Sequence, residues 1–167
     1  MTQAREPSAS QVPDRNVIRA ELERTRTEYL ELLGSLSPED WRHASANTGW
    51  RVGQLMWHVA WAAGYAPQAV EACRKGKGRN PPAWLMHPAN LLITRLGSRN
   101  ATPASVGEKF DRAHAALLPC LEGVKDDEWE KGVMSFGQYS TIATAFRRYT
   151  DHWQEHQAEI LKGLGRT

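Results

Sequence analysis

The fold of this chain is constrained most by a segment near the C-terminus. This segment combines a helical apolar pattern with two histidines. Apolar residues recur there at the three- and four-residue steps of one helical face: Ile142, Ala145, Phe146, Tyr149, Trp153, Ile160 and Leu164. His152 and His156 are four residues apart within this stripe, so we expect both side chains on one face, pointing into the core. A buried imidazole without a partner costs about 1–3 kcal/mol, and two adjacent ones therefore suggest a shared ligand.

Three further segments carry the same helical pattern, and no segment shows the two-residue alternation of a strand. We expect helices over about residues 14–34, 50–73, 102–121 and 140–161. Pro67 should kink or interrupt the second helix, because proline lacks the backbone N–H and clashes with the preceding turn. Four amphipathic helices of this length predict an all-α four-helix bundle.

The long segment between the second and third helices, residues 74–101, has no clear period apart from a short apolar piece at 88–96. We expect an irregular crossover, in which apolar Trp84 and its neighbours form a lid lying on the bundle. The polar residues 1–13 predict a disordered tail, which leaves residues 14–167 as a single domain.

Composition excludes several classes of function. The 167-residue chain has a net charge of only +2, which argues against nucleic-acid binding. Its longest nearly apolar run, Leu55 to Ala63, is far shorter than the roughly 20 residues of a membrane span, and no secretory signal is evident. The cysteines, Cys73 and Cys120, are interpreted as buried thiols in a reducing cytoplasm rather than as a disulfide.

A third histidine, His58, lies next to the apolar stripe of the second predicted helix and is the best partner for His152 and His156. Three imidazoles would form an open site for a divalent metal, with a coordination position left for water or substrate. The alternative is that each histidine is a core residue bonded to a carbonyl or carboxylate. His114 is a weaker candidate for a site role, and the remaining histidines, His43 and His87, should be exposed in turns.

The segment from His152 to His156 also matches the H-x-x-E-H pattern of some zinc proteases. Too little chain follows for a downstream ligand, and Glu155 should point about 100° away from His156, so we discount a protease. Arg51, Arg147 and Arg148, together with arginines of the 74–101 segment, are candidates for binding an anionic thiol cofactor or substrate. The alternative for each arginine is a solvated basic surface.

Two motifs resemble the DinB superfamily, whose members include thiol-dependent S-transferases. One is Gly49-Trp50-Arg51-Val52-Gly53-Gln54-Leu55-Met56-Trp57-His58-Val59-Ala60, and the other is His152-x-x-x-His156 followed by Gln157 and Ile160. The resemblance implies an up-down-down-up bundle with a long crossover between helices two and three, a metal site at His58, His152 and His156, and a homodimer. Pro67 and the basic 74–100 insertion depart from the family pattern, so the substrate cannot be carried over.

These observations leave three hypotheses. The first is an enzyme dependent on zinc, nickel or iron, which transfers a low-molecular-weight thiol to a small electrophile or uses the thiol for an isomerisation. The second is a non-catalytic protein that binds or sequesters a small molecule. The third is a structural or partner-binding bundle, in which the histidines are core residues with ordinary hydrogen-bond partners. The sequence favours the first without naming a substrate.

Overall fold

A computed structural model describes residues 12–166, and the side chain of Ala83 is not described. Of the tail expected at residues 1–13, residues 1–11 lie outside this description. The elements in chain order are α1 (Arg15–Ser35), α2 (Pro38–Arg42), α3 (Val52–Ala63), α4 (Ala66–Lys75), α5 (Ala83–Gly97), α6 (Pro103–Glu122), β1 (Gly132–Ser135), β2 (Gln138–Thr141) and α7 (Ile142–Gly163).

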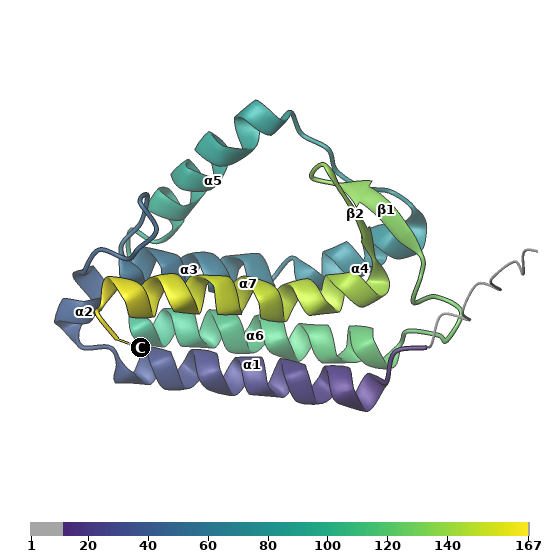
Figure 1. Cartoon of the computed structure of the whole chain (residues 1–167), viewed down its shortest axis with the longest axis horizontal. Coiled ribbons are helices and arrows are strands. Elements are labelled where there is room, and N and C mark those ends of the chain that lie inside the picture. The colour runs from purple at the N-terminus through teal and green to yellow at the C-terminus, as the bar shows by residue number, and fades with distance from the viewer. Residues whose placement is uncertain (1–11, 167) are drawn as a thin grey trace, which may run out of the picture.

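The bundle consists of α1, α6, α7 and the consecutive pair α3–α4, which run side by side in Figure 1. α1 runs opposite to α3–α4, α6 runs parallel to α3–α4, and α7 returns antiparallel to α6. The predicted up-down-down-up bundle with a long crossover before its third long helix is therefore confirmed. No helix in the described part of the chain is long and apolar enough to cross a membrane.

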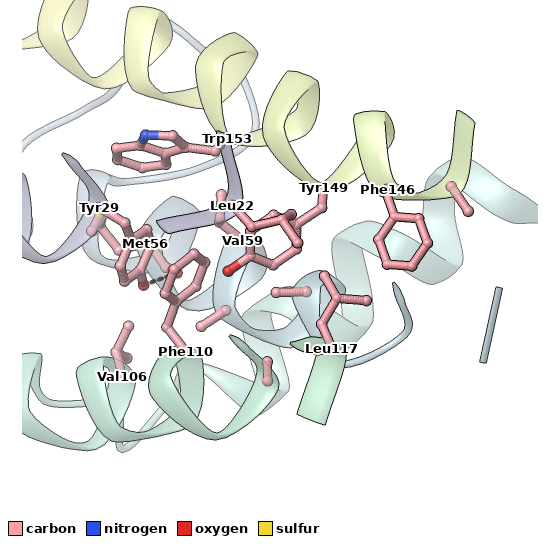
Figure 2. Packing of buried hydrophobic residues seen from close by; sticks show 14 of the residues in the cluster. Leu22, Tyr29, Met56, Val59, Val106, Phe110, Leu117, Phe146, Tyr149 and Trp153 are labelled. Carbon is pink, nitrogen blue, oxygen red and sulfur yellow. Dashed lines mark hydrogen bonds between the residues drawn. The ribbon is translucent and has the colours of Figure 1, made fainter. Parts of the chain in front are cut away.

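Aromatic side chains fill the middle of the bundle, as Figure 2 shows. The rings of Tyr29 and Phe110 stack with centroids 3.7 Å apart, and Trp153 meets Tyr29 edge-on at 5.0 Å. The Tyr29 hydroxyl donates a hydrogen bond of 2.8 Å to the carbonyl of Met56, so its polar atom is satisfied within the core. Burying a side chain such as Phe110 stabilises the fold by about 1.5–3 kcal/mol, and these contacts connect α1, α3, α6 and α7.

Local sequence signals set where the helices begin and break. Asp14 caps α1 and Thr102 caps α6, each accepting a hydrogen bond from a backbone N–H of the first turn. The second predicted helix is divided at Gly64 and Tyr65, and Pro67 lies in the first turn of α4, where a missing N–H costs little. The predicted interruption at Pro67 is confirmed.

The prediction of an irregular crossover with a lid on the bundle was wrong. Residues 83–97 form the helix α5, which slants away from the bundle in Figure 1 and contacts α3. Trp84, expected to cover the body, is 77% exposed. Pro88 lies within α5, and its interruption of the pattern hid the helix in the sequence. His87 is exposed as expected, but on this helix rather than in a turn.

The sequence also gave no indication of the antiparallel hairpin of β1 and β2, whose four-residue strands are too short for a readable alternation. Two residues with positive φ, Phe136 at 52° and Gly137 at 77°, form its turn. This backbone matches the right-handed twist of paired strands. The hairpin also receives the start of the crossover, because the amide N–H of Phe136 donates to the carbonyl of Arg79 at 2.7 Å.

Candidate metal centre and adjoining cavity

Three histidine side chains from two helices converge beside the core. The Nε2 atom of His152 lies 3.1 Å from Nε2 of His156 and 3.3 Å from Nε2 of His58. All three ligand atoms lie within 4.8 Å of one another. A tetrahedral ion with bonds of about 2.0–2.1 Å holds its nitrogen ligands roughly 3.3 Å apart. The spacing therefore fits a divalent metal bound by three imidazoles.

The helices explain why these side chains meet. His152 and His156 are one turn apart on α7, and Trp153 between them is fully buried and holds that face of the helix against the core. His58 comes from the middle of α3 and is 4% exposed. The expectation that the α7 histidines point into the core holds only in part, because His152 and His156 are half-buried. Both residues therefore stay partly exposed to solvent.

Hydrogen bonds among the three imidazoles cannot provide a partner for every Nε2 atom. Nδ1 of His156 donates to Oε2 of Glu159 at 2.7 Å, so Nε2 of a neutral His156 carries a lone pair. Nε2 of His152 holds either one proton or one lone pair, and so only one of its two imidazole contacts can be a hydrogen bond. A metal ion accepts all three lone pairs at once.

Supporting residues fix the ring orientations that a metal would need. Nδ1 of His58 lies 3.2 Å from Oγ1 of Thr94, and donation to that oxygen leaves Nε2 free. Glu159 is held in turn, since the side-chain N–H groups of Asn47 donate to both of its carboxylate oxygens at 3.1 Å. Such outer hydrogen bonds orient ligating histidines and raise their basicity.

Tryptophan rings form the wall around His58. The Trp50 ring stacks on the His58 imidazole with centroids 4.7 Å apart, and it also meets His156 edge-on at 6.3 Å. Trp61 lies on another side of His58, with centroids 6.0 Å apart. These rings limit the access of water to the imidazoles and restrict their rotation.

Burial keeps the imidazoles of His58 and His152 neutral. It lowers the pKa of His58 to about 4, and the neighbouring His156 lowers it further. Burial also lowers the pKa of His152 to about 2, with His156, His58 and Arg148 acting in the same direction. At neutral pH both rings are unprotonated, which is the state that can ligate a metal.

The other three histidines lie outside the trio. His114 is buried on α6, with Nε2 lying 3.1 Å from a carboxylate oxygen of Glu23 and Nδ1 lying 3.5 Å from the Tyr149 hydroxyl. Its neighbours are thus the exposed Glu23 and the buried Tyr149 rather than the trio, and its Nε2 makes no hydrogen bond. His43 and His87 are exposed, as the sequence predicts.

A cavity of about 1140 Å³ opens beside His152, between α4, α7 and the hairpin. Its floor is apolar and includes Val59, Ala63 and Phe110, while the tyrosines Tyr65, Tyr139 and Tyr149 also line it. The volume is slightly above the roughly 300–1,000 Å³ of small-molecule sites. It is large enough for a ligand that extends away from the histidines.

Basic side chains outnumber acidic ones around this cavity. Its basic lining residues are Lys75, Lys77, Arg79, Arg147 and Arg148, against acidic Glu71 and Asp151. Arg148 pairs with Glu155 at 2.9 Å on the surface, which agrees with the expected outward position of Glu155. Arg51 lies elsewhere, in a smaller groove of about 460 Å³. The structure thus brings Arg147, Arg148 and, from the 74–101 segment, Arg79 to the cavity, but not Arg51.

Both cysteines line the same cavity as free thiols. Cys73 is buried as predicted, whereas Cys120 is half-buried. Burial raises the pKa of each thiol. Neither cysteine is therefore ionised at neutral pH, so neither has the character of a nucleophile.

Sequence reasoning missed the residues that support the trio. Glu159 lies three residues after His156, a spacing that could have identified it. Asn47 and Thr94 carried no such signal, because their distances to the site depend on a loop and on the unpredicted α5.

Comparison with known proteins places the chain in a family. The sequence profile of the DinB superfamily matches residues 21–160, so the chain belongs to this superfamily. A search of curated proteins gave no match. A solved structure, the crystal structure of the mycothiol-dependent maleylpyruvate isomerase, is similar with a TM-score of 0.71 and 15% sequence identity. The similarity covers 89% of this chain but only 61% of that chain, and it concerns the fold.

Proposed function

We propose that this member of the DinB superfamily binds one divalent metal ion through His58, His152 and His156, and acts as a thiol-dependent S-transferase or isomerase on a small electrophile. The convergence of three Nε2 atoms carries the proposal, since two of the rings have Nδ1 partners that leave Nε2 free. The choice among zinc, nickel and ferrous iron stays open, because imidazole suits all three.

A bound divalent ion would acidify a thiol or water at its open position. The protein's own part is to keep the His58 and His152 imidazoles neutral and to orient the rings of the trio. Thr94 and Glu159 keep the protons of two rings on Nδ1. Trp50 and Trp61 keep water from the buried side of His58, so a ligand would approach from the cavity beside His152.

The cavity suits a ligand with an anionic and an apolar part. Arg147 and Arg148, which lie five and four residues before His152 on α7 and line the cavity, would bind the carboxylates of a low-molecular-weight thiol. The apolar floor would take the electrophile. Arg51 lines the second groove, so its predicted role requires a ligand that extends beyond the cavity.

The structural neighbour adds support of a general kind, because its name describes a mycothiol-dependent isomerase. Low-molecular-weight thiols are kept reduced in the cytoplasm, and the free Cys73 and Cys120 fit that environment. We therefore include a cytoplasmic location in the proposal, and we add a homodimeric state because the resemblance to the DinB superfamily implies one.

Metal content per chain tests the proposal directly. Untagged protein purified without chelator is analysed by inductively coupled plasma mass spectrometry, beside His152→Ala and the control His87→Ala. We expect about one divalent ion per chain in the wild type and in the control, and almost none in His152→Ala. No metal in any protein, with zinc and nickel titrations also silent, would contradict the proposal.

The second candidate, a protein that binds or sequesters a small molecule without turnover, is favoured by the size and apolar floor of the cavity alone. It predicts tight ligand binding that a chelator does not change. Thermal-shift screening with and without chelator separates the two, because a ligand held by the metal would lose its stabilising effect when the ion is removed.

A further inference from the structure

Helix α5 has too little packing of its own to account for its order. Among its described side chains only Thr94 is buried, and its main contacts are to α3, with Leu91 lying against Gly49 of the loop that precedes α3. Isolated helices of this length are marginal in water. Large apolar side chains nevertheless face solvent: Trp84, Leu85, Leu92, Ile93 and Leu96 are between 41% and 77% exposed. Such a surface marks an interaction site.

Apart from Trp84, these exposed residues lie on one side of α5, opposite to Thr94. Leu85, Ala89, Leu92 and Leu96 follow one another at steps of four, three and four residues, the spacing at which two helices pack along a seam. Pro88 and Ile93 flank this row. We call these six residues the α5 stripe.

The α5 stripe is symmetric about its own midpoint, between Asn90 and Leu91. In an antiparallel pair of two α5 helices centred there, Leu85 meets Leu96, Pro88 meets Ile93, and Ala89 meets Leu92 of the other copy. Each contact occurs twice around a two-fold axis, as an isologous interface requires. The small Ala89 opposite the larger Leu92 lets the helices approach closely at the axis.

Charge also favours this arrangement. Arg95 borders the stripe, and α5 contains no acidic residue that could pair with it. Parallel helices would place the two arginines together. Antiparallel helices place Arg95 opposite Met86, so the like charges lie about nine residues, or roughly 13 Å, apart along the axis.

A membrane surface fits the stripe less well. An interfacial helix carries its basic residues on a solvated polar face. The face of α5 opposite the stripe is instead docked on α3, where Gly97 lies so close to the Trp57 ring that a Cβ would be 2.2 Å from it. Arg95 is the one basic residue that remains on the helix apart from His87.

We propose that the α5 stripe is a homodimer interface, in which two copies of this chain pair their α5 helices antiparallel about a two-fold axis. The inference rests on the homodimer included in the proposed function and names its contact surface. One helix face per chain buries less than the roughly 1,600 Å² of a standard interface, so the dimer should dissociate reversibly at micromolar concentration.

Complementary substitutions at the axis test this register. Ala89→Lys alone and Leu92→Glu alone each put a charge against an apolar surface, and each protein should be monomeric by sedimentation equilibrium at concentrations where the wild type is dimeric. A mixture of the two should recover dimers, because the introduced lysine of one chain then faces the introduced glutamate of the other. Mixing Ala89→Lys with Leu85→Glu should give no recovery, since position 85 faces position 96.

Circular dichroism melts confirm that each variant is folded, which is expected because these positions are not part of the core. A wild type that stays monomeric overturns both the interface and the homodimer. A dimer that survives Leu92→Glu overturns the interface alone. Binding of a monomeric wild type to phosphatidylglycerol–phosphatidylcholine vesicles, lost in Leu92→Glu, would assign the stripe to a membrane. Metal content, measured on the same samples, reports on the proposed function separately.

Discussion

Replacing Glu159 with glutamine tests how the carboxylate beside His156 contributes to metal binding. Nδ1 of His156 donates to this carboxylate at 2.7 Å, and the residue is fixed by two hydrogen bonds from Asn47. Glutamine keeps an acceptor oxygen of the same size but removes the charge. Charge-assisted hydrogen bonds are about twice as strong as neutral ones, and substitutions of this kind cost 10–100-fold in metal affinity.

We expect Glu159→Gln to bind zinc about tenfold more weakly, which corresponds to about 1.4 kcal/mol, because an acceptor for Nδ1 remains. Glu159→Ala should lie nearer to one hundredfold. Affinity is measured at pH 7 by competition with a chromogenic chelator. Melting of the metal-free proteins identifies any loss of folding, since Glu159 also anchors the loop that carries Asn47.

Glu155→Gln is the matched control. It makes the same chemical change one turn earlier on α7, where the carboxylate is exposed and pairs with Arg148. Its zinc affinity should stay within a factor of two of the wild type. Equal affinities for Glu159→Gln and the wild type, or an equal loss in both variants, would refute the role of the Glu159 hydrogen bond.

Two further predictions concern the metal-free fold. Since burial lowers the pKa of His58 from 6.5 to about 4, the unfolded chain takes up a proton between these values that the folded chain does not. The free energy of unfolding is therefore not reduced by His58 above pH 6.5. It falls as the pH drops toward 4, by about 1.4 kcal/mol per pH unit. Urea unfolding at several pH values should show this slope, and His58→Gln should reduce it while His87→Gln does not. Phe136 has a φ of 52° in the hairpin turn, a conformation that asparagine tolerates. Phe136→Asn should therefore raise the free energy of unfolding by about 0.5–1 kcal/mol, which is measured as a higher urea midpoint. An unchanged or lower midpoint would show that contacts of the Phe136 ring outweigh the backbone strain.

The parts of the fold that the sequence predicted are those where burial sets a helical period. The stripe of α7 and the interruption near Pro67 both followed from local chemistry. α5 was missed because its period is carried by residues that face solvent, and because Pro88 stands inside it. Apolar periodicity predicts that a helix face will be buried. It does not say whether that face is buried in the core of the same chain or against another molecule.

The candidate site likewise has a part that the sequence predicted and a part that it did not. The four-residue spacing of His152 and His156, and the position of His58 in α3, were enough to bring the trio together. The hydrogen bonds that connect Thr94 to His58 and Asn47 to Glu159 were not predictable, because Thr94 and Asn47 come from a helix and a loop that only the tertiary structure places.

The imidazole rings of His58 and His156, whose Nδ1 atoms have hydrogen-bond partners, therefore depend on parts of the fold that are packed very differently. Glu159 belongs to α7 and is fixed by the Asn47 side chain, and the Asn47 loop is itself tied to α7 by a 2.9 Å bond from the Ala46 N–H to the Glu159 carbonyl. Thr94 belongs to α5, which contacts α3 and otherwise exposes an apolar stripe. The orientation of His156 is thus set within one chain. The orientation of His58 depends on whether α5 stays in place, which in the proposed homodimer is determined by the second copy.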